Sequence, residues 1–160
     1  MYIMKKTINI FSLLVLLGLT TACFEDYNER WLFTDLRVEF QNAVVQNPSA
    51  GLDYPLVATL RNEAGLRQFQ VNLFGGLSEK EQVIPVRIVT DQSTAIEGTH
   101  FNLPNGLEVR IPAGEAFGSF DIFIPTLENT AAVRLVVELE SNADVKASGN
   151  HKKIGVDIRR

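Results

Sequence analysis

Few side chains in this 160-residue chain are of the types that do chemistry, and they are scattered. The two histidines, His100 and His151, each stand among turn-forming residues, where we expect the first to hydrogen-bond the backbone and the second to be solvated. Asp121 and Glu138 fall in two apolar segments, and a pair of carboxylates flanking a sugar can cleave a glycosidic bond. Nothing in the sequence brings that pair together, and nucleophile-elbow, zinc-protease, P-loop and dinucleotide-binding motifs do not occur. We therefore predict that the protein is not an enzyme and needs no cofactor.

The single cysteine, Cys23, follows a segment with the three-part layout of a secretory signal. Lys5 and Lys6 give this segment a positive start, residues 8–19 are mostly apolar, and small residues precede the cysteine. The apolar part is too short for an ordinary membrane-spanning helix. The segment resembles a bacterial lipoprotein signal, which implies that Cys23 is lipidated and that residues 1–22 are removed. The alternative is an ordinary signal-peptidase site, which would leave Cys23 as a free thiol.

The charge of the chain indicates how the mature protein is held at a membrane. The net charge is −4, and it becomes −6 when Lys5 and Lys6 are removed with the signal. An acidic protein is attracted neither to nucleic acid nor to anionic lipid, so acyl chains on Cys23 would have to form the anchor alone.

Residues 23–32 form a short acidic tether. Acidic residues beyond a lipidated cysteine resemble the surface-export signal of lipoproteins from Bacteroides-like bacteria. This resemblance implies an outer-membrane protein that is exposed at the cell surface. A solvated linker of any other protein would have the same composition.

In the segments that position these residues, apolar side chains recur at every second position. Apolar residues alternate with other residues most clearly in 84–88, 120–124, 133–139 and 154–158, and more weakly in 36–40, 56–60, 68–74 and 107–111. Such alternation predicts strands with one apolar face and one largely polar face. No segment shows a sustained helical period. We therefore expect residues 33–160 to form a single all-β domain, an immunoglobulin-like antiparallel sandwich of seven or eight strands.

Residues 41–54 are expected to form a long loop or an irregular edge, and Tyr27, Trp31 and Phe33 lie near its start. One interpretation is that these three aromatic residues anchor the first strand to the core. The alternative is an exposed aromatic platform that stacks on sugars, to which Trp31, Phe33 and Tyr54 would contribute.

Two stretches in the second half of the chain have a recognisable pattern: TAIEGTHF at 94–101 and VRIPAGE at 109–115. They resemble the turns of Calx-β-like domains, and in particular those of DUF4843-type surface lipoproteins of Bacteroides-like bacteria. The turn-forming residues of these stretches can also be explained without the resemblance. Gly98 permits a turn before Thr99 and His100, while Pro112 and Gly114 return the chain toward the strand that follows.

The same resemblance raises the question of calcium. In calcium-binding Calx-β domains acidic side chains gather at one end of the sandwich, whereas His100 stands where such domains often carry an aspartate. Calcium takes six to eight oxygen ligands, and the scattered candidates Asp91, Glu97 and Asp144 have no spacing that requires them to meet. We expect no metal site.

These observations predict a non-catalytic, lipid-anchored outer-membrane protein, an accessory or structural module that works through protein contacts at the cell surface. Its partners would be the membrane, through the lipid anchor, and neighbouring outer-membrane proteins, but not nucleic acid. The alternative is a glycan-binding lipoprotein of a SusC/SusD-like polysaccharide-uptake system, with polysaccharide as the partner. A third hypothesis, a fimbrial subunit, would require strand addition from another chain.

Overall fold

The computed structural model describes residues 35–58, 64–126 and 131–158. All of these residues belong to one compact unit, Phe33–Arg160. The elements in chain order are β1 (Arg37–Phe40), α3 (Gln41–Val45), β2 (Leu56–Ala58), β3 (Gly65–Phe74), β4 (Gln82–Ile88), β5 (Glu108–Ile111), β6 (Phe117–Ile124), β7 (Val133–Leu139), β8 (Lys146–Ala147) and β9 (Lys153–Ile158).

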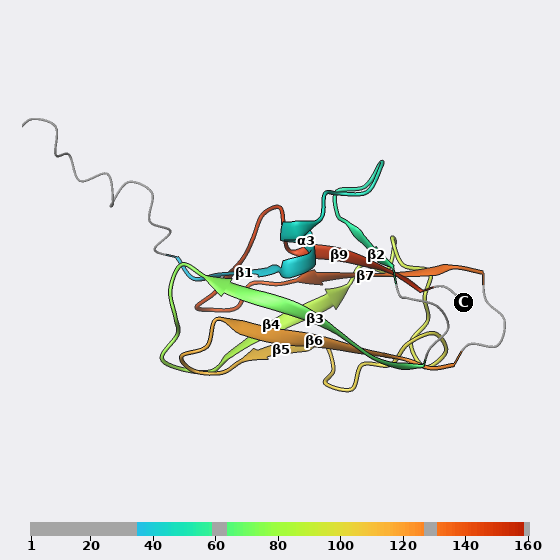
Figure 1. Ribbon diagram of the computed structural model, residues 1–160. Coiled ribbons are helices and arrows are strands. Elements are labelled where there is room, and N and C mark those ends of the chain that lie inside the picture. Colours follow the sequence, from blue (N-terminus) through green and yellow to red (C-terminus); the bar gives the residue numbers. More distant parts are fainter. Residues whose placement is uncertain (1–34, 59–63, 127–130, 159–160) are drawn as a thin grey trace, which may run out of the picture. The chain divides into compact units, whose positions relative to one another are not determined.

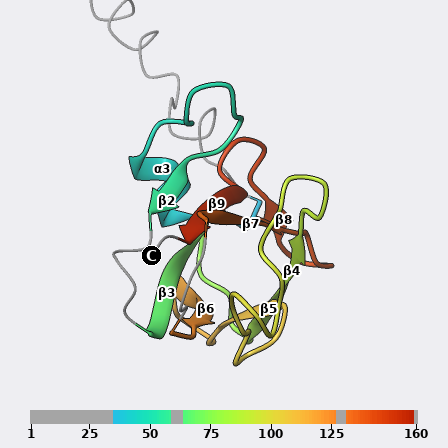
Figure 2. The same ribbon diagram turned by 90° about the vertical axis from the view of Figure 1, so that its right-hand side faces the viewer.

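The strands form two open sheets that pack face to face as a sandwich. One sheet has the strand order β6-β3-β1-β8, and the other has the order β2-β9-β7-β4-β5. Figure 1 shows β3 and β6 running side by side, with β5 next to β6. Figure 2 shows β7 and β9 on the other side of the sandwich from β3 and β6. The mostly-β sandwich that the alternation predicts is confirmed.

Two details of the predicted sheets are wrong. The described segments contain nine strands, because β8 is only two residues long and too short to show an alternation. The sheets are also not wholly antiparallel. β1 pairs with β8 in parallel, and β2 pairs with β9 in parallel, whereas the other strand pairs are antiparallel.

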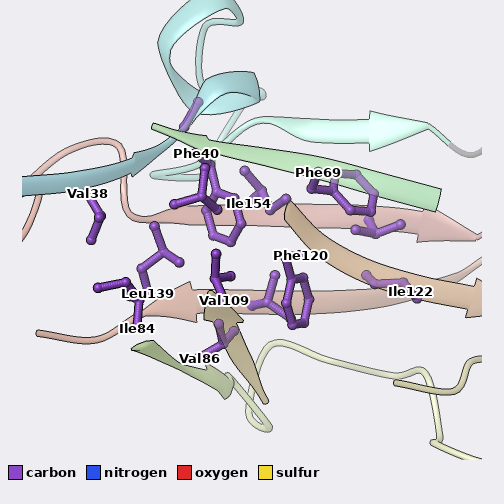
Figure 3. Packing of buried hydrophobic residues seen from close by; sticks show 14 of the residues in the cluster. Val38, Phe40, Phe69, Ile84, Val86, Val109, Phe120, Ile122, Leu139 and Ile154 are labelled. Carbon is purple, nitrogen blue, oxygen red and sulfur yellow. The ribbon is translucent and has the colours of Figure 1, made fainter. Parts of the chain in front are cut away.

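The core lies between the two sheets and is built from the inward residues of the alternating strands. Phe120, Ile122 and Ile124 of β6 are buried there, as the sequence predicts. The rings of Phe40 and Phe120 meet edge to face, with centroids 6.4 Å apart and planes at 68°. Figure 3 shows these rings among branched aliphatic side chains from both sheets. β-branched and aromatic residues suit such strands because they pack well on a pleated surface.

The outer face of the five-stranded sheet is covered rather than exposed to solvent, which corrects the prediction for β7 and β9. Val136 and Glu138 on β7, and Gly155 and Asp157 on β9, are all buried. A second apolar cluster lies on this face, built from Tyr54, Val89 and Val136 with Leu52 and Leu56 against it. Alternation in sequence shows which residues of a strand share a face, but it does not show which loop will cover that face.

The covering segment is residues 46–58, most of which we had expected to be a loop or an irregular edge. It lies so close to β9 that a Cβ atom added at Gly155 would be 2.7 Å from atoms of Leu56 and of the Tyr54 ring. The Ser49 hydroxyl accepts a hydrogen bond from the Leu56 amide (3.0 Å), and the Ser49 amide donates to the Tyr54 carbonyl (3.1 Å). The segment is therefore an ordered outer layer of this sheet.

Candidate functional site

The predicted anchor and two of the predicted sugar-stacking residues lie outside the described residues. These are Cys23, Trp31 and Phe33, together with the signal 1–22 and the tether 23–32. Within the described segments, no helix is long and apolar enough to cross a membrane. Lipidation of Cys23 therefore stays a prediction.

Tyr54, the third predicted stacking residue, is only 1% exposed. Its ring packs against Leu56 and Gly155, and the ammonium of Lys153 lies 5.3 Å from the ring centroid. A ring covered in this way has no open face to offer a sugar. The alternative interpretation, an exposed platform that includes Tyr54, is wrong for this residue, because Tyr54 is buried and anchors the covering segment to β9.

The turn at 96–101 holds itself together. Gly98 has φ of +79°, which favours glycine, and its amide donates to the carbonyl of Phe101 (2.8 Å). The amides of Thr99 and His100 both donate to the carbonyl of Ile96, at 3.2 and 2.8 Å. The Ile96 amide in turn donates to His100 Nδ1 (3.0 Å), so this imidazole nitrogen accepts a backbone bond. With Phe101 buried in the core, the histidine side chain fixes a turn.

The turn at 112–115 carries the chain from one sheet to the other. Gly114 has φ of +77°, and its amide donates to the carbonyl of Ser78 (2.8 Å). The Glu115 amide donates to the carbonyl of Pro112 (3.1 Å), which closes the turn between β5 and β6. Pro112 and Gly114 thus sit in the structural turn at which the two sheets are joined.

A groove of about 620 Å³ lies between α3 and the start of the covering segment on one side and the loop before β9 on the other. Its charged side chains are paired. Buried Glu138 accepts from Arg87 on one oxygen and lies 2.7 Å from Lys152 Nζ on the other. At its rim Lys153 pairs with Asp53 (2.6 Å), and this hydrogen bond is the main reason that the pKa of Asp53 is lowered.

His151, which we expected to be solvated, lines the same groove. Its Nδ1 is 3.3 Å from Glu39 Oε2 of β1, so it is partly buried and engaged with a carboxylate. No serine, threonine, tyrosine or cysteine is among the described residues that line this groove, so no side-chain hydroxyl or thiol stands beside His151 there. The contact of His151 with Glu39 therefore joins the loop before β9 to β1, a strand of the other sheet.

The two carboxylates considered for glycoside cleavage do not meet. Asp121 lies on β6 of the four-stranded sheet, and Glu138 lies on β7 of the five-stranded sheet. Among residues 35–58, 64–126 and 131–158, no three His, Cys, Asp or Glu side chains gather as metal ligands would. Of the calcium candidates, Asp144 forms an ion pair with Lys80 (2.8 Å).

The outward face of β3 and β6 is the feature that reasoning from sequence missed. Along β6 the side chains of Phe117, Ser119, Asp121 and Phe123 alternate with the buried positions and share one face. Phe117 is 57% exposed and Phe123 is 39% exposed. The signal that could have revealed this face is two aromatic residues at the polar positions of one strand.

Beside this face lies a groove of about 400 Å³, lined by Asn105, Glu108, Arg110, Ser119 and Asp121. The Asp121 carboxylate accepts from Ser119, from Asn105 (3.0 Å) and from Gln68 (3.3 Å). Arg110 is held by Glu108 (2.6 Å) and Glu81 (2.8 Å), and these bonds raise the pKa of its guanidinium. The polar groups of the groove are thus held in place by bonds to one another and to neighbouring side chains.

Comparison with known proteins adds no relative to this description: no family model matches the chain, and no curated protein is significantly similar to it.

Proposed function

We propose that the protein is a non-catalytic lipoprotein, anchored in the outer membrane by lipid on Cys23 and exposed at the cell surface. It works as an accessory or structural module through contacts with neighbouring outer-membrane proteins. The support for the anchor is the signal pattern of residues 1–22 with the only cysteine of the chain directly after it.

We also propose that the sandwich is immunoglobulin-like and related to Calx-β domains of the DUF4843 type. The strand order supports this. β1, β3 and β6 are neighbours in one sheet, as are A, B and E in an immunoglobulin domain, and β9, β7 and β4 are neighbours in the other, as are G, F and C. The resemblance of 94–101 and 109–115 to the turns of that family adds to it.

The observation that carries the non-catalytic proposal is how the titratable side chains are used. His100 accepts a backbone hydrogen bond, His151 contacts Glu39, and Glu138 is held between two cations. His100 thus fixes its own turn, while His151 and Glu138 link separate parts of the sandwich. A catalytic acid or base instead has to be within hydrogen-bond reach of a substrate proton.

Fractionation and shaving of cells test the anchor. We expect palmitate to label the wild-type protein in the membrane fraction, and Cys23→Ala to lose both the label and the membrane retention. Protease added to intact cells should remove the wild-type domain, with a periplasmic protein as the protected control. Membrane retention of the unlabelled variant would overturn the anchor, and full protection from protease would place the domain on the inner side of the outer membrane.

A second candidate, the glycan-binding lipoprotein of a polysaccharide-uptake system, is favoured by a different observation. The outward face of β3 and β6 carries two exposed phenylalanines and a set of amide, hydroxyl and carboxylate groups. This face does not depend on Trp31, Phe33 or Tyr54.

A further inference from the structure

We infer that the outward face of β3 and β6 is a binding site for a neutral polysaccharide chain. The inference rests on the glycan-binding candidate above and gives that candidate a location, a ligand class and a direction. We call this surface the β3–β6 face and define it by residues Gln68, Gln70, Phe117, Ser119, Asp121 and Phe123.

The register of the two strands sets the order of groups on the face. Phe117 is opposite Asn72, and Phe123 is opposite Leu66 at the other end. Between these ends Ser119 is opposite Gln70, and Asp121 is opposite Gln68. Hydrogen-bonding side chains therefore form the centre of the face, and an aromatic ring stands at each end.

The spacing of the rings indicates the size of the ligand. Phe123 comes six positions after Phe117, and a strand rises about 3.3 Å per residue, so the two positions are roughly 20 Å apart along β6. One sugar ring cannot contact both phenylalanines at that distance. A chain of several sugars lying along β6 can stack C–H groups on both rings and reach the polar centre in between.

The polar centre has the chemistry that sugar hydroxyls need, because each hydroxyl can both donate and accept. Asp121 offers carboxylate oxygens that are already oriented by Gln68, Asn105 and Ser119. Gln70 donates to Asn72 (2.8 Å), and Asn72 donates to Gln41 (2.6 Å), which fixes a second line of amides next to the first. Side chains held in this way lose little conformational freedom on binding.

Charge favours a neutral chain. Asp121 and Glu108 line the adjoining groove, and its cation, Arg110, is already bound to Glu108 and Glu81. An acidic polysaccharide or a nucleic acid would be repelled there. A protein partner fits less well, because the centres of protein interfaces are apolar, whereas here the apolar groups stand at the two ends and the centre is polar.

Affinity electrophoresis of the mature chain in detergent tests the inference, with gels that contain soluble starch, xylan, galactomannan or mixed-linkage β-glucan, and pectin as the acidic comparator. We expect at least one neutral polysaccharide to retard the wild type. The double variant Phe117→Ala/Phe123→Ala should bind that polysaccharide at least tenfold more weakly, and Gln68→Ala/Gln70→Ala should also bind it more weakly. Both phenylalanines are exposed, so the double variant should fold, as its circular dichroism would show.

Val45→Ala is the matched control, because it removes another exposed apolar side chain at the end of α3, outside β3 and β6, and should bind as the wild type does. If no neutral polysaccharide retards the wild type, the inference and the glycan-binding candidate both fail, and the protein-contact module remains. If the wild type binds and the phenylalanine variant binds equally well, the β3–β6 face is the wrong location while glycan binding stands. Retardation by pectin alone would overturn the neutral ligand class.

Discussion

Gly118 of β6 lies against the backbone of Arg110 in β5, so close that a Cβ atom at Gly118 would be 2.7 Å from the Arg110 carbonyl oxygen. The same atom would lie 2.7 Å from Val109 and 2.9 Å from Ile111. β5 and β6 belong to different sheets. The absence of a side chain at Gly118 therefore lets the edges of the two sheets approach, next to the groove that holds Asp121.

Gly118→Ala should destabilise the protein because the new methyl group meets a backbone atom that cannot move by itself. Overpacking of this kind costs about 1–3 kcal/mol in the free energy of unfolding. Gly149→Ala is the control, since a Cβ atom there meets nothing within 4 Å, and it should change stability by less than about 0.5 kcal/mol. Urea unfolding followed by circular dichroism measures both. Equal midpoints for the two variants would show that β5 and β6 are not packed this closely.

Val136→Ala tests the covered outer face of the five-stranded sheet. Val136 is fully buried beneath Tyr54 and Val89, so the loss of two methyl-sized groups should cost about 1.5–3 kcal/mol. Gln70→Ala, on the exposed face of β3, should change stability by less than about 0.5 kcal/mol. The same unfolding measurement applies. A cost for Val136→Ala as small as that for Gln70→Ala would mean that residues 46–58 do not cover the sheet in solution.

The sequence predicts the buried inner faces of the strands but not which outer faces are covered. The inward face of β6 follows from the alternation of Phe120, Ile122 and Ile124, because a buried face leaves a period of two. The burial of Val136 does not follow, because it depends on where residues 46–58 lie, which is a matter of tertiary packing. β8 contributes two residues, too few for any periodic signal.

Some parts of the candidate functional sites could likewise be predicted from the sequence, and others could not. The turns around Gly98 and Gly114 could be predicted. Both residues have positive φ, a backbone conformation that favours glycine, so the glycines in the sequence indicate the turns. The β3–β6 face could not, because its polar centre combines residues about 50 positions apart, such as Gln68 and Asp121, whose pairing is set by the register of two strands. The sequence instead directed attention to Tyr54, whose ring is buried.

The pairing of Asp53 with Lys153 should be visible in its titration. The hydrogen bond from Lys153 Nζ lowers the pKa of Asp53 below the ordinary value of 3.8. Since the folded-state pKa is depressed, the pair stabilises the fold above pH 3.8, and this contribution is lost as the pH falls through the lowered pKa. Carboxyl NMR titration should show the pKa of Asp53 rising toward 3.8 in Lys153→Met, which removes the ammonium and keeps an unbranched side chain of similar length. An unchanged pKa in that variant would contradict the pairing.

Thermal melts test the expectation that calcium is neither required nor tightly bound. In the described segments no three acidic or histidine side chains gather as metal ligands would, and the His100 imidazole accepts a hydrogen bond within its own turn. A ligand that binds only the native state at a hundredfold excess over its Kd adds about 2.7 kcal/mol, which would shift the Tm of a domain of this size by several degrees. The melts of the mature chain in millimolar calcium and in chelator should therefore coincide, with magnesium at the same ionic strength as the control. A rise in Tm of several degrees with calcium but not with magnesium would contradict this expectation and indicate a calcium-binding module.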